Sequence, residues 1–538
     1  MSGNDPDFYF GLIFDFHGCV KLWEKVTGNM KGVNSLINLS LNQVNCLDGY
    51  FNSDFFYPVF LHTNMKFFER AVSLFYLNAC VFCISSLQAE KDGRPNIVVV
   101  LCDDLGYGDL ACYGHSKIKT PHLDRMAKSG IRFTDFYSTA PVCSPSRVGL
   151  LTGRSPNRAG VYDWIPGGRD VHMRESEVTI PQLLKKAGYA TSMSGKWHCN
   201  GKFNSPQQPQ PDDAGFDHWF ATQNNASPSH ENPKNFVRNG EPVGELEGYS
   251  CQLVVDEALD WLKAKHANNE EKPFFMYVAF HEPHEPVASP KDMVDQYDGI
   301  ARNHNEAQYF ANVTNLDAAV GKLFKNLKSM KLDQNTLVIF TSDNGPETLL
   351  RYGPRSGRSF GSPKPLRGMK LWTTEAGFRV SGIMHWPARI KPGQVSGQTV
   401  SALDFLPTFC DLANAKVPKT LKLDGTSFLP ALGGREVKRE KPLLWVYYSA
   451  LNERRVAMRD GKWKVLARMN FPKTKTINQK NESQAKATTL SDFQIFDLSQ
   501  DIDESKNLAE TNPSKLKELQ KTMEIHYREL VNDSFVWK

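Results

Sequence analysis

The sequence predicts an α/β fold, in which a mostly parallel sheet is flanked by helices and a smaller antiparallel sheet with a helix follows. Unbroken apolar runs of strand length, such as "NIVVVL" at 96–101 and "TLVIF" at 336–340, are typical of parallel strands buried on both faces. Helix signals lie between these runs. Thr120 and Thr179 each stand shortly before a proline, and each segment that they begin ends at a glycine. Strand and helix therefore alternate, which is the pattern of a βαβ architecture.

The pattern of apolar and polar residues changes near residue 440. The segment "RRVAMRDGKWKVLAR" at 454–468 carries β-type patterning on both sides of a glycine, which predicts antiparallel strands. An amphipathic stretch at 513–530 predicts a closing helix. Because 538 residues suffice for a large and a small domain, we expect a main domain at 94–440 and a C-terminal subdomain at 441–538.

Residues 65–89, "MKFFERAVSLFYLNACVFCISSLQA", have the layout of a secretory signal, with a basic start, an apolar run and small residues before Glu90. Because such a signal begins a chain, we expect translation to start at Met65 and residues 1–64 to be an upstream artefact of the gene model or an extension. The alternative is a genuine extension followed by a membrane anchor, but the apolar run is short for a bilayer span and contains Asn78. We therefore expect a secreted or periplasmic protein with no stable membrane insertion.

Composition excludes some classes of partner and scaffold. The formal net charge of +5 is small for this length, and lysine and arginine are scattered, so no nucleic-acid-binding tract is indicated. The ten cysteines lack the regular spacing of a disulfide scaffold or a zinc module. An anionic partner would therefore be bound locally.

Oxygen-bearing side chains follow two of the apolar runs. Asp103 and Asp104 come after the first run, and Asp343 and Asn344 come after a later one. In open α/β sheets function gathers at the carboxyl ends of the strands, so these side chains should converge. Carboxylate and amide oxygens suit calcium or magnesium and are a poor set for zinc. The sequence therefore predicts a site for a hard cation.

Basic and imidazole side chains are expected beside that cation. They stand at other strand ends or in short polar motifs: Arg147, Lys196, His198, His281, His284 and Lys370. Together they would form a cationic ring, which suits a tetrahedral anion with charge on several oxygens. As an alternative, His281 and His284 have the H-x-x-H spacing of zinc ligands, but Pro283 between them disfavours a helix.

Cys143 opens the stretch "CSPSRVGLLTGR", at the start of a predicted helix. This C-x-P-S-R segment resembles the signature of type I sulfatases, and the motifs DD, GKWH, HEPHEP, SDNG and K-x-x-x-x-E stand in that family's order over roughly residues 94–530. The resemblance implies an alkaline-phosphatase-like fold and hydrolysis of sulfate monoesters. It also implies that a formylglycine-generating enzyme oxidises Cys143 to Cα-formylglycine, whose hydrate is the nucleophile.

A hydrated aldehyde can release the sulfate that it binds covalently, whereas a thiol or a serine hydroxyl cannot. Either of those groups, after attack on sulfur, would keep a covalent adduct with no internal group to expel it. The hydrate has two hydroxyls on one carbon, so one attacks the ester and the other, once deprotonated, ejects sulfate and restores the aldehyde. The resemblance implies that Arg147 holds the hydrate and that His198 assists its proton transfer.

The resemblance also implies which residues bind the metal and the sulfate. Calcium would be bound by Asp103, Asp104, Asp343 and Asn344, with the modified Cys143 facing the ion. Sulfate oxygens would be held by Lys196, His284 and Lys370, with His281 at the rim. Either His284 or Lys370 would protonate the leaving alcohol.

A long polar insertion with aromatic residues at 215–243 is expected to contribute to a substrate pocket. It resembles the corresponding part of sulfatases of N-acetylgalactosamine-6-sulfate and related sugars, which implies a sulfated sugar as substrate, with aryl sulfates as surrogates. The nearest alternative enzyme is a formylglycine-dependent phosphonate or phosphodiester hydrolase, in which Asp-His is typical where this chain has Asp343-Asn344. The alternative from another class is a non-catalytic protein that binds sulfated glycans and keeps Cys143 unmodified.

Overall fold

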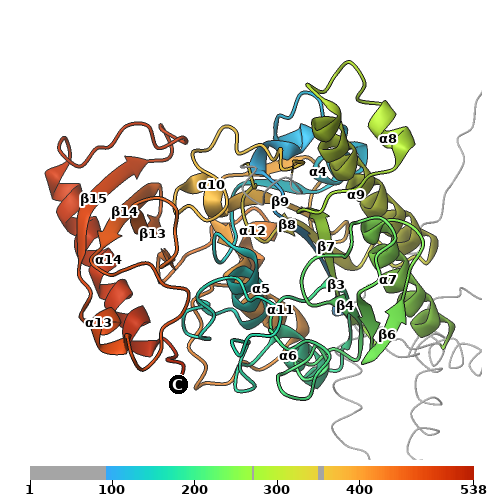
Figure 1. Cartoon of the computed structure of the whole chain (residues 1–538), viewed down its shortest axis with the longest axis horizontal. Helices are drawn as coiled ribbons and strands as arrows, with labels where there is room; N and C mark the ends of the chain where they lie inside the picture. Colours follow the sequence, from blue (N-terminus) through green and yellow to red (C-terminus); the bar gives the residue numbers. More distant parts are fainter. Residues whose placement is uncertain (1–92, 269–271, 349–356) are drawn as a thin grey trace, which may run out of the picture. The chain divides into compact units, whose positions relative to one another are not determined.

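A mixed sheet, with eleven strands among the described residues, forms the centre of the molecule (Figure 1). The computed structural model describes residues 93–268, 272–348 and 357–538, which belong to one compact unit, Glu90–Lys538. The expected extension at 1–64 and signal at 65–89 lie outside the described residues. The strands follow one another in the order β10-β2-β9-β8-β1-β7-β3-β4-β5-β6, and β11 pairs with β2. Their bounds are β1 (Asn96–Asp103), β2 (Ile131–Tyr137), β3 (Ala190–Lys196), β4 (His218–Thr222), β5 (Phe236–Arg238), β6 (Glu241–Gly244), β7 (Phe274–Pro283), β8 (Thr336–Ser342), β9 (Arg379–His385), β10 (Gln394–Ser396) and β11 (Val400–Ser401).

The middle strands of this sheet are parallel and buried, as their apolar runs predicted. β1 lies between β7 and β8 and pairs in parallel with both, and β3 extends the parallel set beyond β7. β9 pairs antiparallel with β2 and β8, and β5 pairs antiparallel with β4 and β6, so the sheet is mixed. The predicted α/β fold with a mostly parallel sheet flanked by helices is therefore confirmed.

Helices cover both faces of the sheet, and β1 divides its side chains between them. Ile97 and Val99 pack with residues of α5, α6 and α11, whereas Val98 and Val100 pack with residues of α4, α7 and α9. This alternation follows from the two-residue period of a strand. The helix bounds are α4 (Pro121–Ser129), α5 (Cys143–Thr152), α6 (Ile180–Lys186), α7 (Ser250–Ala267), α8 (Lys291–Asp295), α9 (His304–Ser329), α10 (Glu375–Phe378), α11 (Phe405–Ala413), α12 (Leu429–Leu432), α13 (Glu482–Ala487) and α14 (Pro513–Asp533). Among the described residues, none of these helices combines the length and the apolar character that a membrane span requires.

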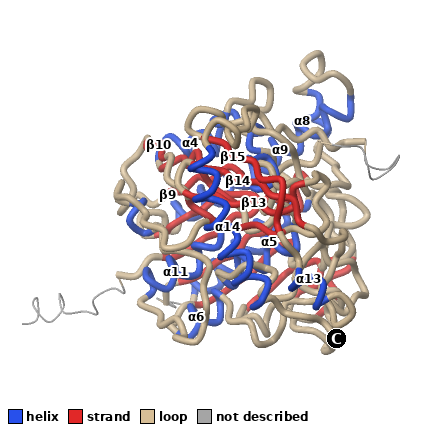
Figure 2. The backbone as a smooth tube through the Cα atoms, turned by 90° about the vertical axis from the view of Figure 1, so that its left-hand side faces the viewer, coloured by secondary structure: helices blue, strands red, loops and turns tan. Residues whose placement is uncertain are grey.

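A second, antiparallel sheet follows the first, as the β-type patterning after residue 440 predicted. Its strand order is β12 (Leu443–Val446), β13 (Arg454–Asp460), β14 (Trp463–Met469) and β15 (Leu490–Asp497). The C-terminal helix α14 lies against these strands (Figure 2), and one apolar cluster contains residues of both, such as Val465 and Met523. The division into domains at 440/441 stays a prediction, because both sheets belong to the same compact unit.

Buried ion pairs join the second sheet to the first. Lys464 Nζ on β14 lies 2.6 Å from Glu375 Oε1 in α10 and 3.3 Å from Glu504 Oε1, and none of the three side chains is exposed. Tyr137 donates a hydrogen bond of 2.7 Å to the Glu375 carboxylate, and Arg379 lies 3.2 Å from it. Burial raises the pKa of Glu375, but Lys464 and Arg379 outweigh that effect and lower it to about 2. Glu375 is therefore kept ionised by the two cations beside it.

Lys464→Met is expected to lower the free energy of unfolding by about 3–5 kcal/mol, because it leaves Glu375 and Glu504 buried without their shared cation. Lys462→Met on the same hairpin should cost less than about 1 kcal/mol, since Lys462 is 54% exposed and pairs with Asp497 near the surface. Urea unfolding of both variants and of the wild type measures these values. Equal effects of the two substitutions would contradict the role assigned to the buried cluster.

Candidate active site

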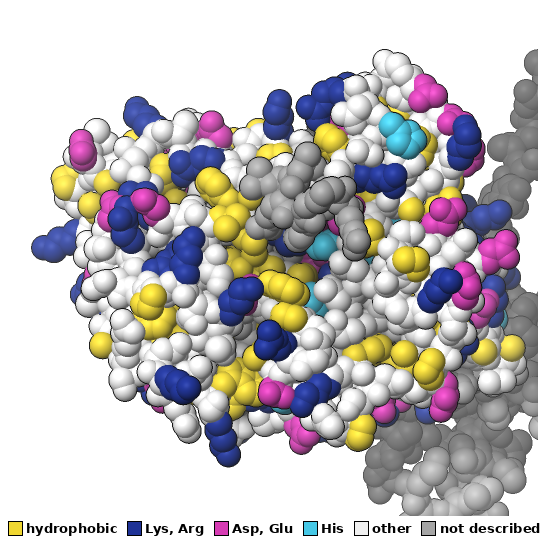
Figure 3. Space-filling model, viewed as in Figure 1, with side chains coloured by type: hydrophobic (Ala, Val, Ile, Leu, Met, Phe, Trp, Pro, Cys, Tyr) yellow, Lys and Arg dark blue, Asp and Glu magenta, His cyan; other side chains and the backbone are white. Residues whose placement is uncertain are grey.

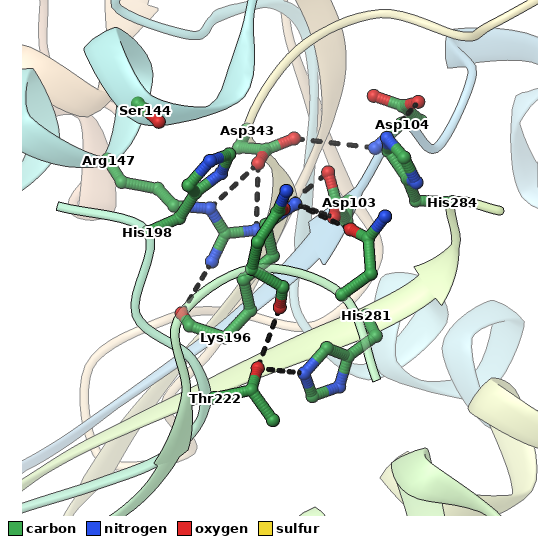
Figure 4. Close-up of polar contacts among 12 residues, drawn as sticks. Asp103, Asp104, Ser144, Arg147, Lys196, His198, Thr222, His281, His284 and Asp343 are labelled. Atoms are coloured by element: carbon green, nitrogen blue, oxygen red, sulfur yellow. Dashed lines mark hydrogen bonds and ion pairs between the residues drawn. The ribbon is translucent and has the colours of Figure 1, made fainter. Parts of the chain in front are cut away.

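The predicted site residues gather at one edge of the main sheet, at the carboxyl ends of its parallel strands (Figure 4). Asp103 ends β1, Lys196 ends β3, and Asp343 directly follows β8. β7 lies between β1 and β3, carries His281 and leads to His284. The viewed face of the molecule is hollowed near its middle, and histidine side chains are visible in the hollow (Figure 3). The structure thus brings together side chains that lie up to 266 residues apart in the sequence.

Cys143 is the first residue of α5, a helix in which every residue is buried. Val142 before it is extended and Pro145 stands in the first turn, so the helix begins at the cysteine. Burial raises the pKa of the Cys143 thiol to about 11, although Lys196 and Lys370 act to lower it. The encoded cysteine is therefore a neutral thiol at pH 7, and a neutral thiol is a poor nucleophile.

Arg147, one turn further along α5, ties the cysteine helix to the strand ends. Its Nε donates to Asp343 Oδ2 at 2.9 Å, and its Nη1 donates to the Lys196 carbonyl oxygen at 2.9 Å. Its Nη2 lies 2.8 Å from the same Asp343 oxygen, and both side chains are fully buried. Burial lowers the pKa of Arg147, but the neighbouring Asp343 and Asp103 help to raise it above its ordinary value. Arg147 therefore stays charged in the interior.

The oxygen atoms of the predicted cation site lie together and contact basic groups. Lys196 Nζ donates to Asp103 Oδ2 at 2.5 Å, and Lys370 Nζ donates to Asp104 Oδ2 at 2.7 Å. Asn344 Nδ2 donates to Asp104 Oδ1 at 2.7 Å. Asp104 has a φ of 63°, in the left-handed region that residues other than glycine rarely adopt. Such strained positions cluster at functional sites, where the surrounding contacts hold them.

Two buried oxygens of this cluster, Asp103 Oδ1 and Asn344 Oδ1, accept no hydrogen bond from the described chain. A buried acceptor without a donor is costly unless another partner satisfies it. Burial raises the pKa of Asp343 to about 7, and Asp103 adds to the rise. The raised pKa of Asp343 indicates that an additional positive charge at this place would stabilise the buried carboxylates. These residues therefore fit a hard cation with oxygen ligands.

His284, which the sequence assigned to sulfate, lies next to the cation site as well. Ligand atoms of Asp103, Asp104 and His284 all lie within 4.8 Å of one another. His284 Nε2 is 3.6 Å from Asp104 Oδ2, and its Nδ1 is 2.6 Å from the Glu285 carbonyl oxygen. Burial, followed by the charge of Lys370, lowers the pKa of His284 to about 4. The ring is therefore neutral at pH 7.

His198 presents a free ring nitrogen in the interior. Its Nε2 lies 3.1 Å from the Ile165 carbonyl oxygen, and because a carbonyl only accepts, the neutral ring carries its proton on Nε2. Its Nδ1 is buried and has no hydrogen-bond partner within the described chain. Burial, followed by Lys196 and Arg147, holds the pKa of His198 well below its ordinary value. His198 is therefore a neutral base with its acceptor nitrogen free.

His281 lies on β7, at the same edge of the sheet as the other predicted site residues, and its part in substrate binding stays a prediction. The residue is fully buried and its Nε2 lies 2.8 Å from Thr222 Oγ1 (Figure 4). Thr222 Oγ1 donates to the Asn224 carbonyl oxygen at 2.7 Å, so it is His281 that donates to Thr222. His281 thus supports the site from within the sheet.

The sequence analysis did not single out two polar residues of the 215–243 insertion. Thr222 ends β4 and bonds to His281, and Asn225 Oδ1 accepts a hydrogen bond from Lys196 Nζ at 3.3 Å. The insertion was expected to contribute to a pocket, but threonine and asparagine are ordinary loop residues. No local signal in the sequence marks these two.

The segment that carries Lys370 is held from both sheets. The Lys370 N–H donates to the Pro346 carbonyl oxygen at 2.9 Å, and the Leu371 N–H donates to the Pro141 carbonyl oxygen at 2.8 Å. From the second sheet, the Leu451 N–H donates to the Leu371 carbonyl oxygen at 2.9 Å. Pro141 and Pro346 each lie two residues from a predicted site residue, so these bonds fix Lys370 relative to the rest of the site.

Comparisons with known proteins agree with this geometry. Residues 95–415 match the protein family described as Sulfatase, and residues 369–533 match the family described as N-sulphoglucosamine sulphohydrolase, C-terminal. The chain is 37% identical to N-acetylgalactosamine-6-sulfatase of Rattus norvegicus over 369 residues, which cover 64% of this chain and 67% of that protein. It is 35% identical to arylsulfatase A of Homo sapiens over 448 residues, which cover 77% of this chain and 83% of that protein.

The fold is also shared with solved structures. The crystal structure of Ps i-CgsB in complex with k-i-k-neocarrahexaose has 30% identity and a TM-score of 0.68, and the match covers 82% of this chain and 94% of that one. The PsFucS1 sulfatase from Pseudoalteromonas sp. has a TM-score of 0.66 at 24% identity, over 85% of this chain and 95% of that one, which shows a common fold. The alkaline-phosphatase-like fold that the resemblance implied is therefore confirmed. Together with the family match over 95–415, these findings establish that the chain belongs to the sulfatase family of sulfuric ester hydrolases.

Proposed function

We propose that the protein hydrolyses sulfate monoesters of sulfated sugars at the cluster around Cys143, with formylglycine made from that cysteine as nucleophile and calcium as the cation. One observation carries the proposal: Cys143 begins a wholly buried helix that the Arg147–Asp343 ion pair anchors to the strand ends. A neutral thiol does not attack a sulfate ester, but its position among basic groups suits a modified residue that binds an anion.

The chemistry of the nucleophile requires a base and a fixed orientation. The modified residue supplies, as a hydrate, one hydroxyl that attacks sulfur and a second whose deprotonation expels sulfate and restores the aldehyde. His198 has the free Nδ1 that proton removal requires. Arg147 holds α5 against Asp343 and the Lys196 carbonyl, and its charge favours an ionised hydroxyl at the start of the helix.

Lys196, His284 and Lys370 would hold the sulfate oxygens. The two ammonium groups reach the same edge of the sheet, where they contact Asp103 and Asp104. The Nδ1 of His284 donates to the Glu285 carbonyl, so its Nε2 is the ring nitrogen directed at the site. The neutral ring has no proton on Nε2, and a bound sulfate dianion would favour the protonated ring, whose Nε2–H donates to a sulfate oxygen. Transfer of a proton from His284 or Lys370 to the leaving oxygen would complete departure of the alcohol.

Calcium would be bound by oxygens of the four residues at the ends of β1 and β8: Asp103, Asp104, Asp343 and Asn344. The buried acceptors Asp103 Oδ1 and Asn344 Oδ1 support this assignment, because neither accepts a hydrogen bond within the described chain. The bound ion supplies a Lewis acid that polarises a sulfate oxygen. The Cys143 end of α5 would face the same ion.

The relatives support a sulfated sugar as the substrate. N-acetylgalactosamine-6-sulfatase and arylsulfatase A are the names of proteins 37% and 35% identical to this chain. We therefore infer a sulfated glycan with N-acetylgalactosamine-6-sulfate-like units, and aryl sulfates as surrogates. The protein would be secreted or periplasmic, with residues 65–89 as its signal, and would meet a formylglycine-generating enzyme before it folds.

The ester that the protein prefers tests this function. Wild-type protein made with a formylglycine-generating enzyme is expected to hydrolyse p-nitrophenyl sulfate with a higher kcat/KM than bis(p-nitrophenyl) phosphate. The Asp343-Asn344 pair favours this order, since Asp-His is typical of the phosphodiester hydrolases. The reverse order would support the phosphodiester alternative, and turnover of neither ester would support the non-catalytic glycan binder.

Cys143→Ala should lower kcat for p-nitrophenyl sulfate by at least about 10³-fold, because alanine cannot become the nucleophile. Cys112→Ala is the matched control, since Cys112 lies in the 3-10 turn Ala111–Tyr113, outside the cluster, and its loss should leave kcat unchanged. Steady-state assays and a melting temperature for each variant separate lost chemistry from lost folding. Activity of Cys143→Ala at the wild-type level would disprove the assignment.

Calcium is expected to raise the melting temperature of protein pretreated with a chelator, because the ion binds the folded state. Asp104→Asn should raise the Kd for calcium at least about tenfold through loss of one ligand charge. Asp295→Asn is the control, since Asp295 is 49% exposed and pairs only with Lys291 on its own helix, so its Kd should match the wild type. A melting temperature that calcium does not change would contradict the cation site.

A further inference from the structure

Trp164 stands exposed in a segment that is otherwise buried. Its residue exposure is 38%, and it is the only aromatic residue among the exposed large hydrophobic residues of the described chain. Its neighbours Asp163 and Ile165 are 4% and 1% exposed. Single apolar residues at a surface are ordinary, and what distinguishes Trp164 is the set of contacts that its two neighbours make.

The residue after Trp164 is bonded to two parts of the catalytic site. The Ile165 carbonyl oxygen faces His198 Nε2 at 3.1 Å, and the Ile165 N–H donates to Ser144 Oγ at 3.0 Å. Ser144 directly follows Cys143 at the start of α5. Trp164 is therefore next in the chain to a residue that contacts both the cysteine helix and His198.

The residue before Trp164 is bonded to the C-terminal part of the chain. The Asp163 carboxylate accepts a hydrogen bond from the Tyr447 hydroxyl at 2.9 Å, and another from the Trp164 N–H at 2.8 Å. Tyr447 belongs to the same buried apolar cluster as Cys143. Because both flanking residues are held, the backbone at Trp164 is fixed, and only rotation of the side chain is left to be ordered when a ligand binds.

Lys475 lies over the indole from a different segment. Its Nζ is 5.2 Å from the centroid of the Trp164 ring, a cation–π distance. Ser449 Oγ donates to the Thr474 carbonyl oxygen at 2.8 Å, which holds the loop next to Lys475. Burial raises the pKa of the nearby Asp163 carboxyl, and the charge of Lys475 acts against that rise. Lys475 is exposed, so an anion from solvent can reach its ammonium group.

We infer that Trp164 and Lys475 form a binding subsite for the sugar next to the one that loses its sulfate, in a negatively charged glycan. The inference rests on the proposed function, which places the sulfate at Lys196 and Lys370. A pyranose ring presents an apolar C–H face that packs on an indole, and one indole face remains when a lysine covers the other. The ammonium group pairs with a sulfate or carboxylate of that sugar. An aryl sulfate has no second ring, so this pair distinguishes a glycan from a small ester.

Inhibition of p-nitrophenyl sulfate hydrolysis tests the subsite. The competitors are a chondroitin 6-sulfate hexasaccharide, which reaches beyond the sulfate pocket, and inorganic sulfate, which fills that pocket alone. Trp164→Ala should raise the inhibition constant of the hexasaccharide about tenfold and Lys475→Ala about threefold. Both variants should keep the inhibition constant of sulfate and the kcat/KM for the aryl ester within about twofold. Trp164→Phe should retain most of the affinity, since it keeps an aromatic face.

Trp463→Ala is the matched control, because Lys462 Nζ lies 5.3 Å from the Trp463 ring, as Lys475 lies over Trp164. Trp463 pairs with Asp460 at one end of β13, and Arg454 is at the other end of that strand. The control substitution should change neither inhibition constant. An equal rise for hexasaccharide and sulfate in Trp164→Ala would show that the indole only shapes the pocket, and would overturn the subsite. An unchanged constant, or a wild type that binds the hexasaccharide no better than sulfate, would overturn it too.

If the proposed sulfatase function is wrong, the subsite can still be tested by direct binding. If the wild type hydrolyses no p-nitrophenyl sulfate, calorimetric titration with the same hexasaccharide still compares the wild type with Trp164→Ala. Weaker binding by the variant would support the subsite in a protein that is not a catalyst. Equal binding would reject the subsite as well.

Discussion

The buried ion pair between Arg147 and Asp343 is the interaction on which the rest of the site depends. Arg147 Nη2 and Asp343 Oδ2 lie 2.8 Å apart with both side chains fully buried, and Arg147 also binds the Lys196 carbonyl oxygen. The pair joins the cysteine helix α5 to the ends of β8 and β3. Because Arg147 is buried and charged, moving the helix away from Asp343 would leave this charge without its nearest carboxylate, at a large electrostatic cost. Cys143 therefore occupies a fixed place among the strand ends.

The second sheet completes the site through the segment that carries Lys370. Leu451 donates to the Leu371 carbonyl oxygen at 2.9 Å, and Asn452 Oδ1 accepts from the Thr373 N–H at 3.0 Å. Further along the same segment, Glu375 is bound by Lys464 of β14 at 2.6 Å. Lys370 thus has its position set by contacts with both sheets. The C-terminal part of the chain therefore helps to set the position of Lys370.

The sequence predicted the elements whose signals are local. Asp103 and Asp343 follow apolar runs, and Lys196 stands in the short motif GKWH. The rule that function gathers at the carboxyl ends of parallel strands places such residues together. The contact of His281 with Thr222 was not predicted, because the spacing H-x-x-H does not reveal that β7 buries this side chain against Thr222. The pairing of Glu375 with Lys464 spans 89 residues, and no pattern in either segment indicates its partner. Long-range polar contacts depend on tertiary packing, which a single sequence does not encode in a periodic signal.

The mass of the tryptic peptide that contains residue 143 tests the central claim most directly, when it is measured on a preparation whose turnover of an aryl sulfate is known. The account predicts that this residue has lost its thiol sulfur and gained an aldehyde oxygen, and that the modified fraction rises in proportion to specific activity. A fully active preparation in which residue 143 is unmodified cysteine would contradict the account, because the neutral buried thiol has no means to expel sulfate after attack.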